Sequence, residues 1–255
     1  MRIGCLCVTE RRAHLFGIAV AAYADQEHED RCLVVVCPTG EVAEYESVLA
    51  RLGINPEIVP TELRGANTAL RRLDLGCKHL VDAGCNAIAT WDDDDWKHPT
   101  YLGEVSRRFE QNLAWLVTGY KWGLYVNARH LWAEDLSEHV KEPWGFWGAS
   151  LAYRSVVWYS GYRFDRPGVG FQGYDPRLCQ DVGKLHWAPP IDDDPYKMLS
   201  FCHDLNCYQH CRGGGFDLAP WISDNLSVRA RTEIYRVRQY FIDHNIEPPQ
   251  VQGPY

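Results

Sequence analysis

The sequence predicts an α/β protein with a mostly parallel sheet flanked by helices. Short apolar runs rich in β-branched residues alternate with longer segments of helical spacing over the first 112 residues. Strands that alternate with helices in this way form parallel sheets. The length of 255 residues fits one large domain with a sizeable core, or at most two small ones.

The elements of the first half follow from local patterns. Residues 3–8 are an apolar run that ends at a polar cluster, and residues 32–37 are a β-branched run bounded by Pro38 and Gly40. The amphipathic helix of residues 41–53 closes at its final glycine. The predicted order is strand 3–8, helix 15–26, strand 32–37, helix 41–53, strand 56–60, helix 67–84 and strand 86–91.

The second half of the chain is less regular. A helix is expected near 100–112, then strands and a short helix, then a loop-dominated stretch at 165–200 and an amphipathic helix within 225–245. No internal repeat or linker divides the chain. We therefore predict one domain over 1–223, made of halves 1–112 and 113–223, followed by a C-terminal helix and tail at 224–255.

The charge and hydropathy of the sequence indicate which partners and which cellular location are disfavoured. The net charge of -8, from 26 Lys+Arg against 34 Asp+Glu, disfavours nucleic acid or an anionic membrane as a partner of the whole surface. No apolar run approaches the roughly 20 residues of a membrane span, and the first residues lack a signal-peptide core. We expect a cytoplasmic protein in which most of the ten cysteines are reduced core residues.

Four adjacent carboxylates, Asp92–Asp95, stand between two tryptophans directly after the predicted strand 86–91. Parallel sheets bind ligands at the carboxyl ends of their strands, where this cluster is expected. Carboxylates so close repel one another, and a divalent cation such as Mg, Mn or Ca stabilises them most simply. A solvated acidic turn is the alternative interpretation.

Two segments resemble a known family. The string "WDDDDWKHPTYL" resembles the Asp-x-Asp segment of GT-A glycosyltransferases, in particular family 2. The stretch "CLCVTERRAHLFGIAVAAYADQEHEDRCLVVV" is similar to that family's first strand, Thr-x-x-Arg turn, helix and second strand. The resemblance extends over residues 3–110. It implies a GT-A, Rossmann-like fold whose second half binds the acceptor.

The resemblance also implies roles for residues. Asp94 corresponds to the metal-binding carboxylate, and Asp92 to a contact of the ribose or of the metal shell. The other positions implied in the nucleotide-sugar site are Thr9, Arg12, Asp93, Asp95 and one of the pair Arg71 and Arg72. An exposed helix face is the alternative for these two helix arginines. The family's usual base-reading Asp after the second strand is replaced here by Cys37, which leaves the nucleobase open.

The resemblance implies that the general base and a further metal ligand lie in the second half of the chain. The order of "GYDPRLCQD" and "HDLN" in the resemblance nominates Asp175 as base and His203 as a metal or diphosphate ligand. Asp181 and the aspartates 192–194, including Asp194, compete with Asp175. A zinc site is a separate interpretation of the segment that holds Cys202, His203, Cys207, His210 and Cys211.

The resemblance implies a metal-dependent, inverting glycosyltransferase that uses a nucleotide-sugar donor and Mn²⁺ or Mg²⁺. A non-catalytic nucleotide- or carbohydrate-binding protein of the same fold is the first alternative. A nucleotidyltransferase is the second, although a glycine- and lysine-rich phosphate loop is absent near the N-terminus. The acceptor could be a saccharide, a lipid-linked sugar, a protein or a modified nucleobase, so nucleic acid enters only as an acceptor.

Overall fold

The computed structural model describes a mixed α/β chain. The residues it describes are 1–65, 68–120, 123–127, 132–135, 150–165, 178, 181–183, 186–191, 197–201, 216–217 and 228–243.

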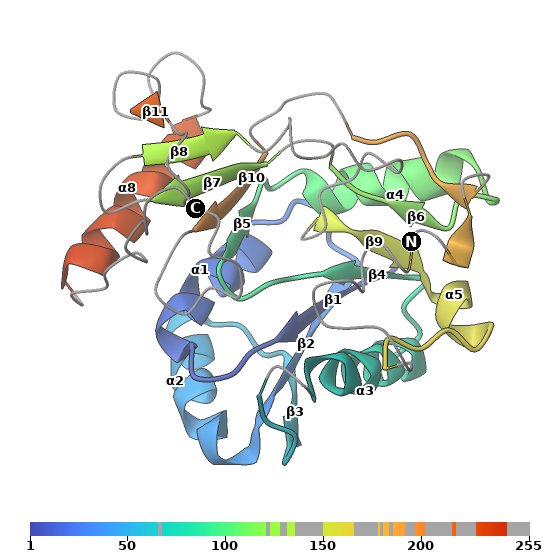
Figure 1. Cartoon of the computed structure of the whole chain (residues 1–255), viewed down its shortest axis with the longest axis horizontal. Coiled ribbons are helices and arrows are strands. Elements are labelled where there is room, and N and C mark those ends of the chain that lie inside the picture. The colour runs from blue at the N-terminus through green and yellow to red at the C-terminus, as the bar shows by residue number, and fades with distance from the viewer. Residues whose placement is uncertain are drawn as a thin grey trace, which may run out of the picture.

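A six-stranded sheet forms the centre of the molecule, with the strand order β3-β2-β1-β4-β9-β6 (Figure 1). Strands β1 to β4 are parallel, β9 runs antiparallel to β4, and β6 runs antiparallel to β9. The strands are β1 (Ile3–Val8), β2 (Arg31–Pro38), β3 (Glu57–Thr61), β4 (Ala87–Thr90), β6 (Val117–Thr118) and β9 (Ala152–Arg154). The mostly parallel sheet confirms the predicted fold class.

Helices cover both faces of this sheet (Figure 1). One hydrophobic cluster joins buried residues of α1, α2 and α4 to one face, while a second joins α3 and α5 to the other. Helix α2 ends where Gly53 adopts a φ of 67°, a left-handed conformation that favours glycine. The helices are α1 (Ala13–Ala24), η1 (Thr39–Glu41), α2 (Val42–Leu52), α3 (Ala69–Asp82), α4 (Tyr101–Gln111) and α5 (Ser155–Tyr159).

The strand order places a topological switch point between β1 and β4. From β1 the chain moves outward through β2 to β3, and then returns to form β4 on the opposite side of β1. In open α/β sheets, ligands bind in the crevice at the carboxyl ends of such a pair of strands. Thr9 follows β1 and the aspartate cluster follows β4, so both lie at this position.

A second sheet, of order β11-β8-β7-β10-β5, was not predicted from the sequence. Its first strand in chain order includes the last residue of the aspartate cluster, since β5 spans Asp95–Lys97 and pairs antiparallel with β10. The fourth carboxylate is therefore part of a buried strand rather than a solvated turn. The remaining strands are β7 (Leu124–Asn127), β8 (Trp132–Asp135), β10 (Met198–Phe201) and β11 (Phe216–Asp217).

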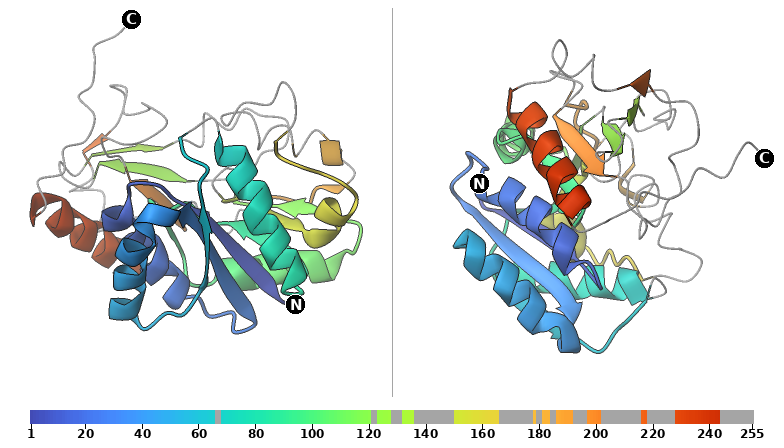
Figure 2. Two further views of the ribbon diagram at one scale, coloured as in Figure 1. Left: turned by 90° about the horizontal axis from the view of Figure 1, so that it is seen from below. Right: turned by 90° about the vertical axis from the view of Figure 1, so that its left-hand side faces the viewer.

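The C-terminal helix α8 spans Val228–Asp243, within the range expected from its amphipathic pattern. Ala230, Ile234, Val237 and Phe241 are buried and join the core cluster that also contains residues of α1 and β10. Figure 2 shows α8 beside the N-terminal part of the fold. None of the described helices is long and apolar enough to cross a membrane.

The tryptophans that flank the acidic cluster belong to the core. Trp91 is 1% exposed and donates its indole N–H to the Ala19 carbonyl at 2.8 Å, and Trp96 is 3% exposed. They anchor the two ends of the acidic loop. The six cysteines in the described part of the chain are free, as predicted, and five of them are buried.

Candidate active site

The acidic cluster is a tight turn tied to the segment that follows β1. The backbone N–H of Asp95 donates to the Asp92 carbonyl at 3.3 Å, which closes a four-residue turn. The Thr9 hydroxyl donates to Asp93 at 2.6 Å, and Arg12 pairs with the other oxygen of Asp93 at 2.9 Å. The structure thus joins the Thr-x-x-Arg segment and the aspartates across the β1/β4 switch point.

Asp93 is one of the two aspartates of the cluster that face inward, with a side chain only 3% exposed. Burial raises the pKa of its carboxyl, while Arg12 and the Thr9 hydroxyl oppose that rise. The Tyr45 hydroxyl supports the same contacts, since it lies 3.0 Å from the Thr9 hydroxyl and accepts from the Arg12 backbone N–H at 3.3 Å. We assign Asp93 to holding the loop in place, which leaves the neighbouring carboxylates to face a ligand.

Asp92 and Asp94 are partly exposed and alternate with the two buried aspartates. One oxygen of Asp94 lies 3.5 Å from the Arg12 guanidinium, which is therefore shared between Asp93 and Asp94. Desolvation by the surrounding protein raises the pKa of Asp92 to about 6; Lys97 opposes this effect, and the charges of Asp94 and Asp93 add to it. An ionised Asp92 is consequently a high-energy group that a cation would stabilise.

Lys97 provides a second basic group beside the aspartate turn, and no sequence pattern predicted this role. Its side chain is fully buried, with Nζ 3.7 Å from Asp95 Oδ2 and 4.9 Å from the centre of the Trp91 ring. Within the described part of the chain neither Nζ nor Oδ2 has a hydrogen-bond partner. Burial raises the pKa of Asp95 well above its usual range; Lys97 opposes that rise, as does a hydrogen bond from Ser200.

The charges of the cluster fit a divalent cation. Four carboxyl groups, Asp92–Asp95, lie near the two basic groups Arg12 and Lys97 among the described residues, so acidic groups outnumber basic ones at this turn. Those residues contain no group of three His, Cys, Asp or Glu side chains that could hold a metal by itself. In proteins, Mg²⁺ is usually bound by one or two carboxylates together with substrate phosphates.

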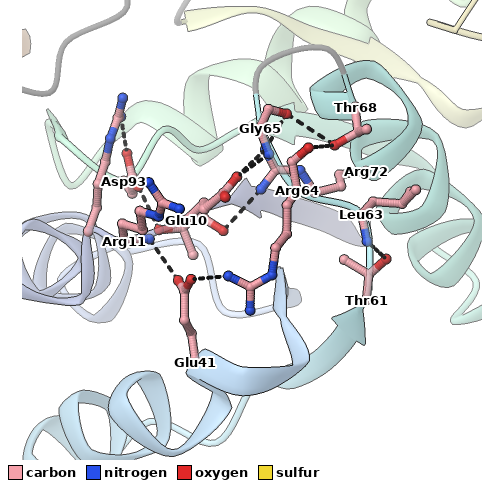
Figure 3. A network of polar contacts seen from close by, with 12 residues as sticks. Glu10, Arg11, Glu41, Thr61, Leu63, Arg64, Gly65, Thr68, Arg72 and Asp93 are labelled. Atoms are coloured by element: carbon pink, nitrogen blue, oxygen red, sulfur yellow. Dashed lines mark hydrogen bonds and ion pairs between the residues drawn. The ribbon is translucent and has the colours of Figure 1, made fainter.

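A second network joins the loops that follow β1, β2 and β3 (Figure 3). The Glu41 carboxylate accepts the Arg11 backbone N–H at 2.7 Å and pairs with Arg64 at 3.3 Å. Glu10 accepts the Gly65 N–H at 2.8 Å and pairs with Arg72 at 3.1 Å. These three loops at the carboxyl edge of the sheet are therefore connected to one another and to helix α3, and the two glutamates that connect them were not predicted as site residues.

Arg11 marks strain at this edge, because its φ of 58° is positive and it is not a glycine. Such residues persist where surrounding contacts enforce them, and they gather at functional sites. The hydrogen bond from its backbone to Glu41 supplies that enforcement here.

The two candidate helix arginines have different positions. Arg72 is 4% exposed, and its guanidinium also donates to the Thr9 carbonyl at 3.4 Å and the Gly65 carbonyl at 3.3 Å. The side chain of Arg71 is 60% exposed and pairs with Asp165 at 2.8 Å. Arg72 therefore belongs to the network beneath the site, whereas Arg71 lies on the exposed helix face.

Cys37 is fully buried and packs in the hydrophobic core. It occupies the position at which the family that this sequence resembles has an acidic residue. Burial raises the pKa of its thiol to about 11, so the group stays neutral. The carboxylate nearest in sequence after β2 is Glu41, which already binds Arg11 and Arg64.

Several predicted residues lie outside the part of the chain that the structure describes. These are Asp175, the aspartates 192–194, and the residues of the second metal or zinc interpretation, Cys202, His203, Cys207, His210 and Cys211. Asp181 is described and is exposed. Their roles stay predictions from the sequence.

The raised pKa of Asp92 should make the stability of the metal-free protein depend on pH. A carboxyl whose pKa is about 6 when folded, against an ordinary 3.8, holds its proton more tightly in the native state. The free energy of unfolding should thus fall as pH rises from about 4 to 6, by roughly 1–3 kcal/mol. Urea denaturation in EDTA measures this slope. Asp92→Asn should flatten it, and equal slopes in both proteins would contradict the assignment.

Comparison with known proteins supports the fold. S. aureus TarS (residues 1–349), solved with UDP, aligns with a TM-score of 0.59 and 13% identity over 95% of this chain and 72% of that chain. The mannosyltransferase PcManGT from Pyrobaculum calidifontis, in complex with GDP-Man and Mn²⁺, gives 0.54 and 14% over 94% and 70%. Glucosyl-3-phosphoglycerate synthase from Mycobacterium tuberculosis, with Mn²⁺ and UDP-glucose, gives 0.53 and 12% over 80% and 72%.

These alignments confirm the predicted GT-A fold, the fold of nucleotide-sugar glycosyltransferases. No protein-family model matches the sequence, and no curated protein does. At identities of 12–14% the likeness extends to the fold alone, and the chemistry depends on the residues of the site.

Proposed function

We propose that the protein is a metal-dependent, inverting glycosyltransferase that moves a sugar from a nucleoside-diphosphate donor to an acceptor hydroxyl. The observation that carries this proposal is the aspartate turn at the β1/β4 switch point, where four carboxylates face two cations. Solved proteins of the same fold contain UDP, GDP-Man with Mn²⁺, and UDP-glucose with Mn²⁺. The excess of acidic groups at this turn and the fold both favour a nucleoside-diphosphate ligand bound together with a divalent cation.

In this proposal Asp94, together with Asp92, holds Mn²⁺ or Mg²⁺ beside the donor diphosphate. The bound cation supplies positive charge to a leaving group that gains negative charge as the glycosidic bond breaks. Asp93 fixes the aspartate turn in place through its contacts with Thr9 and Arg12. The buried Lys97 ammonium lies close to Asp95 and offsets the charge of that carboxylate. These buried contacts keep the two ligand-facing carboxylates in position before the donor arrives.

We place the acceptor and the general base in the second half of the chain. Inverting transfer needs a group that takes the proton from the attacking hydroxyl, and Asp175 is our candidate from the sequence. The acceptor stays open among a saccharide, a lipid-linked sugar, a protein and a modified nucleobase. The nucleobase of the donor is open as well, because Cys37 offers no carboxylate to it.

A thermal-shift screen tests the donor class. A ligand that binds the native state raises Tm by mass action, so UDP-sugars and GDP-sugars should be compared with Mn²⁺ present. We expect at least one nucleotide sugar to raise Tm and then to be hydrolysed or transferred slowly. A nucleotide sugar that binds but is never turned over would favour the alternative, a binding protein of this fold. Turnover of a nucleoside triphosphate instead would favour a nucleotidyltransferase.

The preferred cation tests His203. If its imidazole nitrogen joins the carboxylates around the ion, activity removed by EDTA should return better with Mn²⁺ than with Mg²⁺. Metal-dependent donor binding should also weaken as pH falls through about 6.5, since the imidazole must be neutral to bind. His203→Ala should flatten the Mn²⁺ preference. A variant that unfolds and releases zinc would instead support the structural zinc interpretation.

A further inference from the structure

Two thiols meet at the amino end of the sheet, opposite to the candidate active site. Cys32 lies near the start of β2 and Cys85 lies just before β4, and their sulfur atoms are 3.2 Å apart. These two strands are not neighbours, because β1 lies between them in the sheet. The thiols therefore meet across an intervening strand.

Gly4 makes this contact possible. It pairs with Cys32 in the β1/β2 register, and a Cβ atom at position 4 would lie 3.0 Å from the Cys85 sulfur and 2.5 Å from Leu80 Cδ2. Any side chain at this point of β1 would occupy the space that Cys85 uses to reach Cys32. The glycine thus opens a passage over β1 for a thiol that comes from the loop after α3.

The two cysteines differ in a way that suits stepwise oxidation. Cys32 is partly exposed, whereas Cys85 is 3% exposed. The hydrogen bond with Cys85 lowers the pKa of Cys32 to about 7, burial opposes this, and the nearby Arg2 guanidinium lowers it further. The pKa of Cys85 is raised, by the same hydrogen bond and by burial. Thiolate character and access together favour reaction at Cys32 first.

The other cysteines in the described part of the chain lack this combination. Cys5, Cys7, Cys37 and Cys77 are fully buried, and burial raises the pKa of each thiol. Cys77, for example, contacts the Tyr153 hydroxyl at 2.9 Å. They are small core residues, whereas Cys32 and Cys85 form a pair.

We propose that Cys32 and Cys85 are a peroxide-reactive pair that forms a reversible intramolecular disulfide. Cys32 loses its proton to solvent, its thiolate attacks one oxygen of hydrogen peroxide and the O–O bond breaks. The departing hydroxide takes up one proton from solvent, so a sulfenic acid and one water result. The Cys85 sulfur then attacks the sulfenic sulfur, the S–O bond breaks, and a second water leaves with the Cys85 proton. In total two thiols are oxidised by two electrons and one peroxide is reduced to two waters.

The bridge requires a small movement. The sulfur atoms must approach by about 1.2 Å to reach the S–S bond length near 2.05 Å. The two cysteines are 53 residues apart, so a bridge closes a loop that contains β2, α2, β3 and α3. Closing a loop of this length restricts the unfolded chain and should raise Tm by about 5 °C or more.

Peptide mapping tests this pair. The full-length protein is treated with hydrogen peroxide, alkylated and digested without reduction. We expect one peptide pair joined through Cys32 and Cys85, lost on treatment with dithiothreitol, and a higher Tm for the oxidised protein. Cys7→Ala, which removes a buried thiol of β1 outside the pair, should leave the linkage unchanged.

Two variants separate the steps. In Cys85→Ser, the Cys32 sulfenic acid should persist and react with dimedone, whereas in Cys32→Ser the Cys85 thiol should stay unmodified. Recovery of both cysteines as free thiols from peroxide-treated wild type would overturn the proposal. So would Cys32 sulfinic acid without linkage, or a bridge from Cys32 to another cysteine. An oxidised protein with the bridge and an unchanged Tm would contradict the stabilising effect.

Discussion

Asp94→Asn is expected to abolish transfer, with a loss of about 1000-fold, and to remove metal-dependent donor binding. The amide keeps the size of the side chain but lacks the charge that holds the cation, so the developing charge on the diphosphate loses its stabilisation. The fold should survive. Asp94 is partly exposed, and its removal reduces repulsion with Asp92.

The matched control for this variant is Asp82→Asn. Asp82 is 62% exposed and forms a surface pair with Lys78, so the substitution should change neither activity nor stability measurably. Transfer rates, Tm and Mn²⁺-dependent binding of the donor are measured on all three proteins. Near-normal turnover by Asp94→Asn would remove the proposed role of this carboxylate.

Asp175→Asn is expected to lower the transfer rate by about 100-fold or more, the usual scale for loss of a general base. Donor affinity should be largely kept, because the substitution leaves the aspartate turn and its cation intact. The comparison of kcat with the donor dissociation constant separates this effect from that of Asp94→Asn, which should damage both.

The competing aspartates provide the control for the base. Asp181→Asn should be close to wild type, as expected for a carboxylate that is exposed in the structure. If Asp175→Asn stays active while a substitution at Asp181 or Asp194 removes transfer, the base lies further along the chain. The donor-binding half of the proposal would be unaffected by that outcome.

The first half of the fold was predictable because its strands and helices carry strong local signals. The β-branched run of β2 and the glycine that ends α2 define their elements without help from the rest of the chain. The carboxyl-edge position of the aspartates follows from a buried strand that runs directly into them. The local sequence pattern was sufficient to predict a strand or helix wherever that element could be recognised without its partners.

The second sheet could not be predicted, because its strands are short and, apart from the neighbouring pair β7 and β8, their partners are distant in sequence. Strand β5 has three residues, two of them charged, and it is defined by pairing with β10 about one hundred residues later. Hydropathy does not identify such a strand. Pairing across the fold overrides the polar character of Asp95 and Lys97, which are both buried.

At the site, the sequence predicted which residues take part, but not which of the carboxylates are buried against basic groups and which are exposed to a ligand. Four adjacent aspartates look equivalent as a string, yet Asp93 and Asp95 face inward to Arg12 and Lys97. Two arginines adjacent on α3 separate into the buried Arg72 and the exposed Arg71 because they lie on different faces of the helix. These distinctions depend on contacts of the loop after β1 with the aspartate turn and with α3, and on the pairing of β5 with β10, which no local pattern encodes.

The central claim is that the aspartate turn binds a nucleoside diphosphate through a divalent cation, and calorimetric titration tests it most directly. UDP and GDP are titrated into the wild-type protein in excess EDTA and again after Mn²⁺ is restored. The proposal predicts no measurable binding in EDTA and binding of at least one of the two nucleotides with Mn²⁺. Equal binding in both conditions, accompanied by full transfer activity in EDTA, would contradict the metal role of Asp92 and Asp94.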